Sequence, residues 1–179
     1  MNTPSERVHL GLGSNQGDRA DHLRQAVRAI AAWPEVRALR VSPVYETAHV
    51  VDDDDSSDDG APDHLNLCLA LEGAPEPDEI LRRGQALERR AGRAPDTHQR
   101  PRPLDVDVLL AAGVVSSDPA LTLPHPRLAQ RRFVLQPLAD LDPALTIAGT
   151  GATVTELLAR PEVAAQRIER TNLELNGDA

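Results

Sequence analysis

The stretch RPRPLDVDVLL, residues 100–110, predicts a strand, because apolar side chains alternate with Asp105 and Asp107. Side chains two apart on a strand point to the same face, so the two carboxylates project together, about 7 Å apart at their bases. Paired carboxylates on an apolar strand repel each other and are costly to desolvate. A divalent cation would remove both costs, and such oxygen ligands favour Mg²⁺ together with substrate phosphates. Because D-x-D is short, an exposed strand with solvated aspartates is the alternative.

The composition limits the classes of protein to which the chain can belong. At 179 residues it fits one domain with a sizeable core. The net charge is −9, but the run Asp52–Asp59 supplies six of the negative charges and the remainder is −3. Arg100 and Arg102 suit phosphate oxygens, yet an acidic chain without a basic stripe argues against binding a nucleic-acid backbone.

The lone cysteine and the apolar runs give expectations about location. Cys68 excludes an intramolecular disulfide, which suits a reducing cytoplasm, and it fits a small buried side chain better than a nucleophile. No signal peptide is visible in Met1–Glu6, and the longest apolar run, Val108–Val115, is too short to span a bilayer. We therefore expect a soluble cytoplasmic protein that does not bind membranes.

The remaining patterns predict four strands and two helices in the order β-α-β-β-α-β. This is the ferredoxin-like arrangement, an α+β fold with an antiparallel sheet and both helices on one face. The predicted elements are a strand at Val8–Leu12, a helix at Asp18–Trp33, a strand at Val36–Tyr45 interrupted by Ser42-Pro43, a strand at Leu65–Leu71, a helix at Pro77–Gly92 and the strand above.

The C-terminal third adds shorter elements to this core. We expect extended structure at Val114–Leu121, a helix at Arg131–Leu138 interrupted at Pro137, and a short helix that the Thr153/Glu156 capping box starts. Residues 7–160 are predicted to form one domain, and residues 161–179 a polar tail that is disordered from Ala165 onward.

The polar residues indicate a site on the sheet face opposite the helices, which loops would cover. Asn66 and the aspartate pair come from different strands and would meet on its floor, beside the turn Gly13–Asn15. Two long loops, Thr47–Asp63 and Arg93–Pro103, would form its walls. The segment 125–133 adds an imidazole, arginines and the only phenylalanine, although each of these taken singly has an ordinary structural explanation.

The order and spacing of these motifs resemble the 6-hydroxymethyl-7,8-dihydropterin pyrophosphokinases of folate biosynthesis. The resemblance covers about Val8 to Leu145. The matching segments are Gly11–Asn15, Val44–Thr47, Leu65–Asn66, Pro101–Asp107, Leu123–Arg127 and Arg131–Leu135.

The resemblance implies transfer of pyrophosphate from ATP to the hydroxymethyl group of the pterin, with release of AMP. It implies that Asp105 and Asp107 hold two Mg²⁺ and act in catalysis with Arg93 and Arg102. The implied ATP contacts are Gln85, Glu88, Arg102, Val108, Thr122, His125 and Arg131. The implied pterin contacts are Ser14, Thr47, His64, Asn66, Asp105 and Phe133.

The chain departs from the family pattern in both long loops. His64 stands where an aromatic usually faces Phe133, and an imidazole offers less stacking area. The second loop is one residue shorter and lacks a common tryptophan, and Pro103 replaces a common threonine. The run Asp52–Asp59 enlarges the loop expected to close over the pterin, where we interpret it as a solvated insertion.

Two other functions remain open from the residues alone. A nucleotidyltransferase would also use Gly13-Ser14 and a D-x-D strand, although in that superfamily the two elements lie closer in sequence than the roughly 90 residues here. A non-catalytic ferredoxin-like binding module predicts no metal-dependent turnover and leaves the aspartate pair, His125 and Phe133 without a shared explanation.

Overall fold

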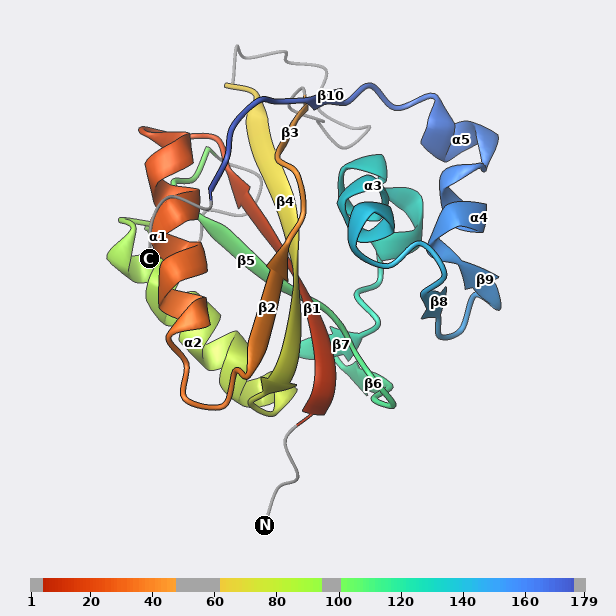
Figure 1. The fold of residues 1–179 in the computed structure, drawn as a ribbon, viewed down its shortest axis with the longest axis horizontal. Helices are drawn as coiled ribbons and strands as arrows, with labels where there is room; N and C mark the ends of the chain where they lie inside the picture. Colours follow the sequence, from red (N-terminus) through yellow and green to blue (C-terminus); the bar gives the residue numbers. More distant parts are fainter. Residues whose placement is uncertain (1–4, 48–61, 95–100, 176–179) are drawn as a thin grey trace.

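The computed structural model describes residues 5–47, 62–94 and 101–175, and its centre is a six-stranded antiparallel sheet (Figure 1). The strands lie in the order β10-β3-β4-β1-β5, and β2 also pairs with β4. Their bounds are β1 Ser5–Ser14, β2 Ala38–Val41, β3 Tyr45–Thr47, β4 His64–Ala74, β5 Asp105–Ala111 and β10 Glu169–Arg170. The predicted ferredoxin-like α+β core is confirmed.

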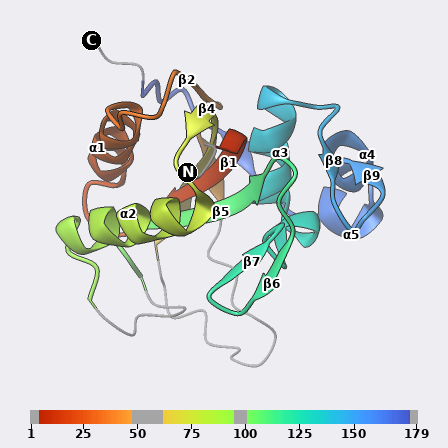
Figure 2. The same cartoon turned by 90° about the horizontal axis from the view of Figure 1, so that it is seen from below.

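Two helices cover one face of the sheet, as expected. They are α1 Arg19–Ala31 and α2 Pro77–Arg90 (Figure 2). Asp18 caps α1 by accepting a hydrogen bond from Asp21 N, and Pro77 opens α2. Alternate apolar residues of β1, β4 and β5 pack beneath these helices into the larger of two hydrophobic clusters, which includes Leu10 and Leu69. Each fully buried leucine there contributes about 1.5–3 kcal/mol.

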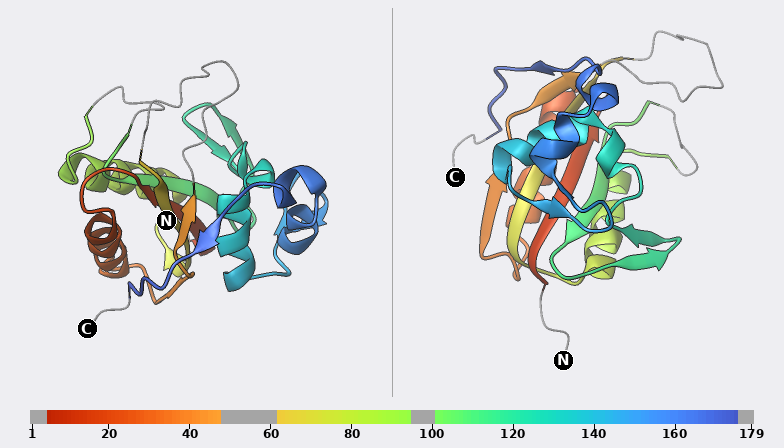
Figure 3. Two further views of the ribbon diagram at one scale, coloured as in Figure 1. Left: turned by 90° about the horizontal axis from the view of Figure 1, so that it is seen from above. Right: turned by 90° about the vertical axis from the view of Figure 1, so that its right-hand side faces the viewer.

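The opposite face is covered by helices as well as loops, which corrects our expectation. There α3 Arg132–Leu141 packs on β3 and β4, backed by the short helices α4 Val154–Leu158 and α5 Pro161–Ala164 (Figure 3). Pro137 does not end α3, because burial of Pro137 and Leu138 offsets the single backbone hydrogen bond that proline lacks. The remaining short elements are β6 Ser116–Asp118, β7 Leu121–Leu123, η1 Leu128–Gln130, β8 Thr146–Ile147 and β9 Ala152–Thr153.

Two local predictions are confirmed in detail. The interruption at Ser42-Pro43 separates β2 from β3, and both strands pair with β4. The capping box forms at the start of α4, where the Thr153 hydroxyl accepts from Glu156 N and the Glu156 carboxylate accepts from Thr153 N. Among the described residues no helix is long and apolar enough to cross a membrane.

The tail was expected to be disordered from Ala165, and for residues 165–175 this is wrong. β10 pairs with β3, and Thr171 N donates to the carbonyl oxygen of Val44. Leu175 is buried in the cluster beneath α1 and α2. The segment is polar, but it is ordered by two contacts: β10 pairs with the edge strand β3, and Leu175 is buried.

His9 on β1 is fully buried, and neither ring nitrogen has a hydrogen-bond partner in the described part of the chain. Burial lowers the pKa of His9 from 6.5 to about 4. The unfolded chain therefore takes up a proton on this imidazole as the pH falls below 6.5, while the folded chain does not until about pH 4. Stability should fall with pH across that window by about 3 kcal/mol.

We expect His9→Leu to remove this component of the pH dependence. Urea unfolding at several pH values between 6.5 and 4 measures it, with His22→Leu on α1 as a control for the same substitution at another histidine. Parallel free-energy curves for the wild type and His9→Leu would contradict a neutral buried imidazole.

Candidate functional site

The floor of the candidate site is a row of residues across three strands. Gly13 on β1 pairs with Asn66 on β4 and with Asp105 on β5, so the three lie side by side. A Cβ atom at position 13 would come within 3.2 Å of Asn66 Oδ1 and 3.9 Å of the Asp105 Cβ. Glycine therefore leaves the space between the amide and the carboxylate free of a side chain.

Asp105 lies in a cluster of four charged side chains. Its two carboxylate oxygens accept from Arg93 Nη1 and Arg102 Nη2, each at 2.7 Å. Glu88 Oε1 lies 2.7 Å from Arg93 Nη1 and also accepts from Val106 N at 2.9 Å. Burial and the nearby charge of Asp105 raise the pKa of Glu88. Two arginines thus offset the charge of two carboxylates at the start of β5.

Asp107 differs from Asp105 in its surroundings. No side chain or backbone group among the described residues donates a hydrogen bond to its carboxylate. Burial, reinforced by the charge of Asp105, raises the pKa of Asp107 from 3.8 to about 7, although Arg102 and Arg131 act in the opposite direction. An acidic group without a donor at neutral pH is suited to a cationic ligand that enters from outside.

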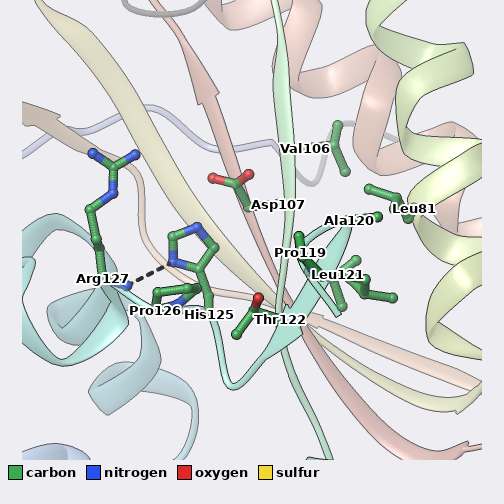
Figure 4. Close-up of a pocket in the computed structure, with 11 residues that line it drawn as sticks. Leu81, Val106, Asp107, Pro119, Ala120, Leu121, Thr122, His125, Pro126 and Arg127 are labelled. Carbon is green, nitrogen blue, oxygen red and sulfur yellow. Dashed lines mark hydrogen bonds between the residues drawn. The ribbon is translucent and has the colours of Figure 1, made fainter. Parts of the chain in front are cut away.

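Asp107 lines a cavity of about 300 Å³, which Figure 4 shows in close-up. The cavity lies between β5, the β6–β7 hairpin and the segment that begins at His125, and its volume is at the lower end of small-molecule sites. Its lining residues are Leu81, Val106, Asp107, Val108, Pro119, Ala120, Leu121, Thr122, His125, Pro126 and Arg127.

His125 is fixed in this wall by backbone hydrogen bonds. Its N–H donates to the carbonyl oxygen of Leu109 at 2.7 Å, and its ring Nδ1 accepts from Arg127 N at 3.3 Å. Burial and the neighbouring arginines Arg131 and Arg127 lower the pKa of His125, so the imidazole is neutral at pH 7. With Nδ1 as acceptor, Nε2 carries the proton and can donate to a ligand.

The residues that the resemblance implies for ATP lie in three places. Val108, Thr122 and His125 line the cavity, and Thr122 Oγ1 donates to the carbonyl oxygen of Asp118. Glu88 belongs to the charged cluster, and Gln85 is exposed on α2 without lining the cavity. The guanidinium of Arg131 lies over the Phe133 ring, 5.4 Å from its centre.

Three of the residues implied for the pterin, Asn66, Thr47 and His64, lie together at the Asn66 end of the floor. Asn66 Nδ2 donates to Thr47 Oγ1 at 2.9 Å, and His64 pairs with Thr47 across β3 and β4. Phe133 lies in the first turn of α3. The hydroxyl of Ser14 is buried and donates to the carbonyl oxygen of Pro103 at 2.6 Å, which occupies its one proton.

Asn15 connects the ends of the two long loops, a role that sequence reasoning missed. Its Oδ1 accepts from Arg102 N at 2.7 Å, its backbone N–H donates to Arg102 O, and its Nδ2 donates to Pro62 O at 3.4 Å. The only sequence signal was its place in the Gly-Ser-Asn turn. Arg100 and the acidic run Asp52–Asp59 lie outside the described residues.

No group of three or more histidine, cysteine, aspartate or glutamate side chains within the described ranges could hold a metal ion. Asp105 and Asp107 supply two carboxylates, so an ion there would need ligands from water or substrate. The described part of the site does fit a cation, because the Asp107 carboxylate lacks a donor and carries an unfavourable charge.

A ferredoxin-like sheet that carries paired carboxylates and clustered arginines beside a small cavity defines a class, the enzymes that handle phosphorylated small molecules. Comparison with known proteins defines the family within this class. Residues 9–143 match the model of the 7,8-dihydro-6-hydroxymethylpterin-pyrophosphokinase family. The chain belongs to this family, and its activity is pyrophosphoryl transfer from ATP to hydroxymethyldihydropterin in folate biosynthesis.

Several curated relatives support the assignment. A 2-amino-4-hydroxy-6-hydroxymethyldihydropteridine pyrophosphokinase of Methylorubrum extorquens is 38% identical over 154 residues, which cover 86% of this chain and 92% of that protein. One of Bacillus subtilis is 35% identical over 134 residues, or 75% of this chain and 77% of that protein. These alignments span most of both proteins.

A solved structure shows the same fold. The Plasmodium falciparum HPPK-DHPS with pterin and p-hydroxybenzoate superposes with a TM-score of 0.60 at 14% identity. The match covers 87% of this chain and 43% of that chain, so this chain spans less than half of the protein it matches.

Proposed function

We propose that the acidic end of β5 is the reaction centre of this pyrophosphokinase, and that ATP and the pterin meet there. The observation that supports this most is Asp107 at the cavity wall, a carboxylate to which no described residue donates a hydrogen bond. It lies two residues from Asp105, which two arginines hold. Asp105 also ends the row that runs through Gly13 to Asn66, so it would touch both substrates.

Asp105 and Asp107 would hold Mg²⁺, and we expect two ions. When bound, the metal would neutralise charge on the triphosphate oxygens and orient them. The donor set suits it, since both ligands are hard oxygens and the remaining ligands would come from phosphates and water.

The rest of ATP would lie in the cavity and along the charged cluster. Val108 and Thr122 would contact the base or ribose, with His125 donating from Nε2. We assign Gln85 and Glu88 to the same nucleotide, although Gln85 would need to turn toward it. Arg93, Arg102 and Arg131 would neutralise the phosphates, because guanidinium groups match phosphate oxygens with two parallel donors.

The pterin would lie over the opposite end of the floor. A flat bicyclic ring needs a stacking surface and an edge of donors and acceptors, which Phe133 and the Asn66–Thr47 pair would supply. His64 would stack from the other side, and Ser14 would contribute through its hydroxyl oxygen as an acceptor.

The chain's own residues would act mainly by positioning and charge neutralisation. The pterin hydroxyl oxygen would attack the β-phosphorus and lose its proton to solvent. The new O–P bond would form as the bond from the β-phosphorus to the α,β-bridging oxygen breaks, and AMP would leave with that oxygen. Such a transfer needs in-line geometry and neutralised charge more than covalent help from the protein. Arg93 and Arg102 pair with the Asp105 carboxylate at 2.7 Å, so they would turn from it to the phosphates as Asp105 takes up its metal-binding role.

A direct test is to incubate the chain with ATP, Mg²⁺ and 6-hydroxymethyl-7,8-dihydropterin and to follow the products by chromatography. The proposal predicts AMP and a pyrophosphorylated pterin. Release of pyrophosphate with nucleotide transfer would instead indicate a nucleotidyltransferase, and binding without turnover a non-catalytic module.

The assignment of His64 gives a separate prediction. We expect His64→Tyr to lower KM for the pterin by about threefold, because a phenol ring offers more stacking area than an imidazole. Steady-state kinetics at saturating ATP measures it, and KM for ATP is the internal control. A higher KM for the pterin would place His64 away from the ring.

We also infer that the protein works in the cytoplasm. Its one cysteine is buried and free, burial raises the pKa of that thiol, and its co-substrate is ATP. Residues 7–160 would form the catalytic domain and residues 161–179 an appended tail, of which Glu169–Arg170 pair with β3.

A further inference from the structure

The proposed pterin site would have two walls, and the fold must keep them at a fixed distance. One wall would be the Asn66–Thr47 pair on β4 and β3, and the other Phe133 on α3. These elements come from separate parts of the chain and meet on the face of the sheet opposite α1 and α2 (Figure 3). Something must fix α3 against β3.

Tyr45 makes that connection. It lies on β3, paired with Asn66, and its side chain is buried. Its hydroxyl donates to Asp140 Oδ2 at 2.6 Å. Asp140 belongs to α3, so a single phenol ties that helix to the strand that carries Thr47 two residues further on.

The partner of Tyr45 shares a helix face with Phe133. At 3.6 residues per turn, positions 133 and 140 are separated by roughly 20° around the helix axis. Phe133 lies at the N-terminal end of this face and Asp140 two turns later, near its C-terminal end. A hydrogen bond at position 140 therefore resists rotation of α3 about its axis, which would swing the Phe133 ring away from the strand.

We propose that Tyr45 is a positioning residue for the pterin: through Asp140 it fixes the rotation of α3, and so the gap between Phe133 and the Asn66–Thr47 pair. This rests on the proposed placement of the pterin. Tyr45 itself need not touch either substrate.

The surroundings of Tyr45 allow an effect on the pterin site to be separated from an effect on folding. Asp140 is exposed, so on loss of the phenol hydroxyl its carboxylate turns to water without an unsatisfied buried charge. The ring of Tyr45 remains to fill the space in Tyr45→Phe. The variant should therefore fold normally, while α3 gains rotational freedom at the site.

The test is steady-state kinetics of Tyr45→Phe, Asp140→Ala and the double variant. We expect KM for the pterin to rise about five- to tenfold in each, with no further rise in the double variant, because all three lose the same hydrogen bond. KM for ATP and kcat should stay within about twofold. Asp142→Ala, at the C-cap of the same helix and paired with Arg7, is the matched control.

A spectroscopic readout confirms that the intended contact was removed. Tyr45 is the only tyrosine, so the near-ultraviolet absorbance of the phenolate reports its titration alone. Burial, together with Asp140, raises the pKa of Tyr45 to about 12, and Asp140→Ala should lower it.

Each outcome decides the proposal. An unchanged KM for the pterin in Tyr45→Phe, or an equal rise of both KM values with a lower melting temperature, would overturn it. AMP release by the wild type tests the proposed function separately. If the wild type releases no AMP, the proposed pterin site is wrong, and the role proposed for Tyr45 is wrong with it.

Discussion

Asp107→Asn is expected to lower kcat by about a thousandfold or more while the protein stays folded. The replacement keeps the shape of the side chain but removes the negative charge that would hold the metal and, through it, the triphosphate. Because the Asp107 carboxylate has no donor among the described residues and its pKa is raised to about 7, loss of the charge costs the fold nothing. Melting temperature should stay the same or increase.

Initial rates of AMP release and thermal unfolding measure the two halves of this prediction. Asp78→Asn, an exposed aspartate in the first turn of α2, is the matched control and should change neither. An Asp107→Asn enzyme with near wild-type kcat in Mg²⁺ would show that this carboxylate is not a metal ligand.

Asp105→Asn should lose both activity and stability. Its carboxylate is the shared acceptor of Arg93 and Arg102, and these ion pairs are largely shielded from solvent. Its removal leaves Arg102 without its carboxylate partner, and Arg102 Nε has no hydrogen-bond partner in the described part of the chain. We expect kcat to fall by a factor similar to that of Asp107→Asn and the free energy of unfolding by about 2 kcal/mol.

Urea unfolding of the two variants side by side tests this contrast. The difference in the free energy of unfolding between the two variants is more informative than either value, because the two aspartates are two residues apart on one strand. Equal stability of both variants would mean that the Arg93–Asp105–Arg102 contacts are not held in solution.

Much of the fold could be predicted because short-range patterns determine it. The alternation in β1, β4 and β5, the Asp18 cap and the Thr153/Glu156 box each depend on residues within a few positions of one another. Ser42-Pro43 predicted the break between β2 and β3, since proline lacks the donor that a continuous strand needs.

The parts that could not be predicted depend on contacts distant in sequence. The order of residues 165–175 comes from pairing with β3, more than 100 residues away, and nothing in their polar composition indicates it. The position of α3 over the second sheet face likewise follows from its packing on β4. Asn15 unites Pro62 with Arg102 only once the chain is folded.

The candidate site shows the same division. Spacing predicted that Asp105 and Asp107 act as a pair, but it could not show that arginines hold one of them and that the other has no donor among the described residues. Val108, Thr122 and His125 do meet at one cavity, whereas Leu81 and Pro119 line it without any motif to indicate this.

The most direct test of the metal site is electron paramagnetic resonance of Mn²⁺ added with a non-hydrolysable ATP analogue, compared between the wild type and Asp107→Asn. Mn²⁺ takes the place of Mg²⁺ on oxygen ligands and reports how many ions are held. We predict two tightly bound ions in the wild type and fewer in Asp107→Asn. The same number, held equally tightly in both proteins, would contradict the assignment of this strand as the metal-binding centre.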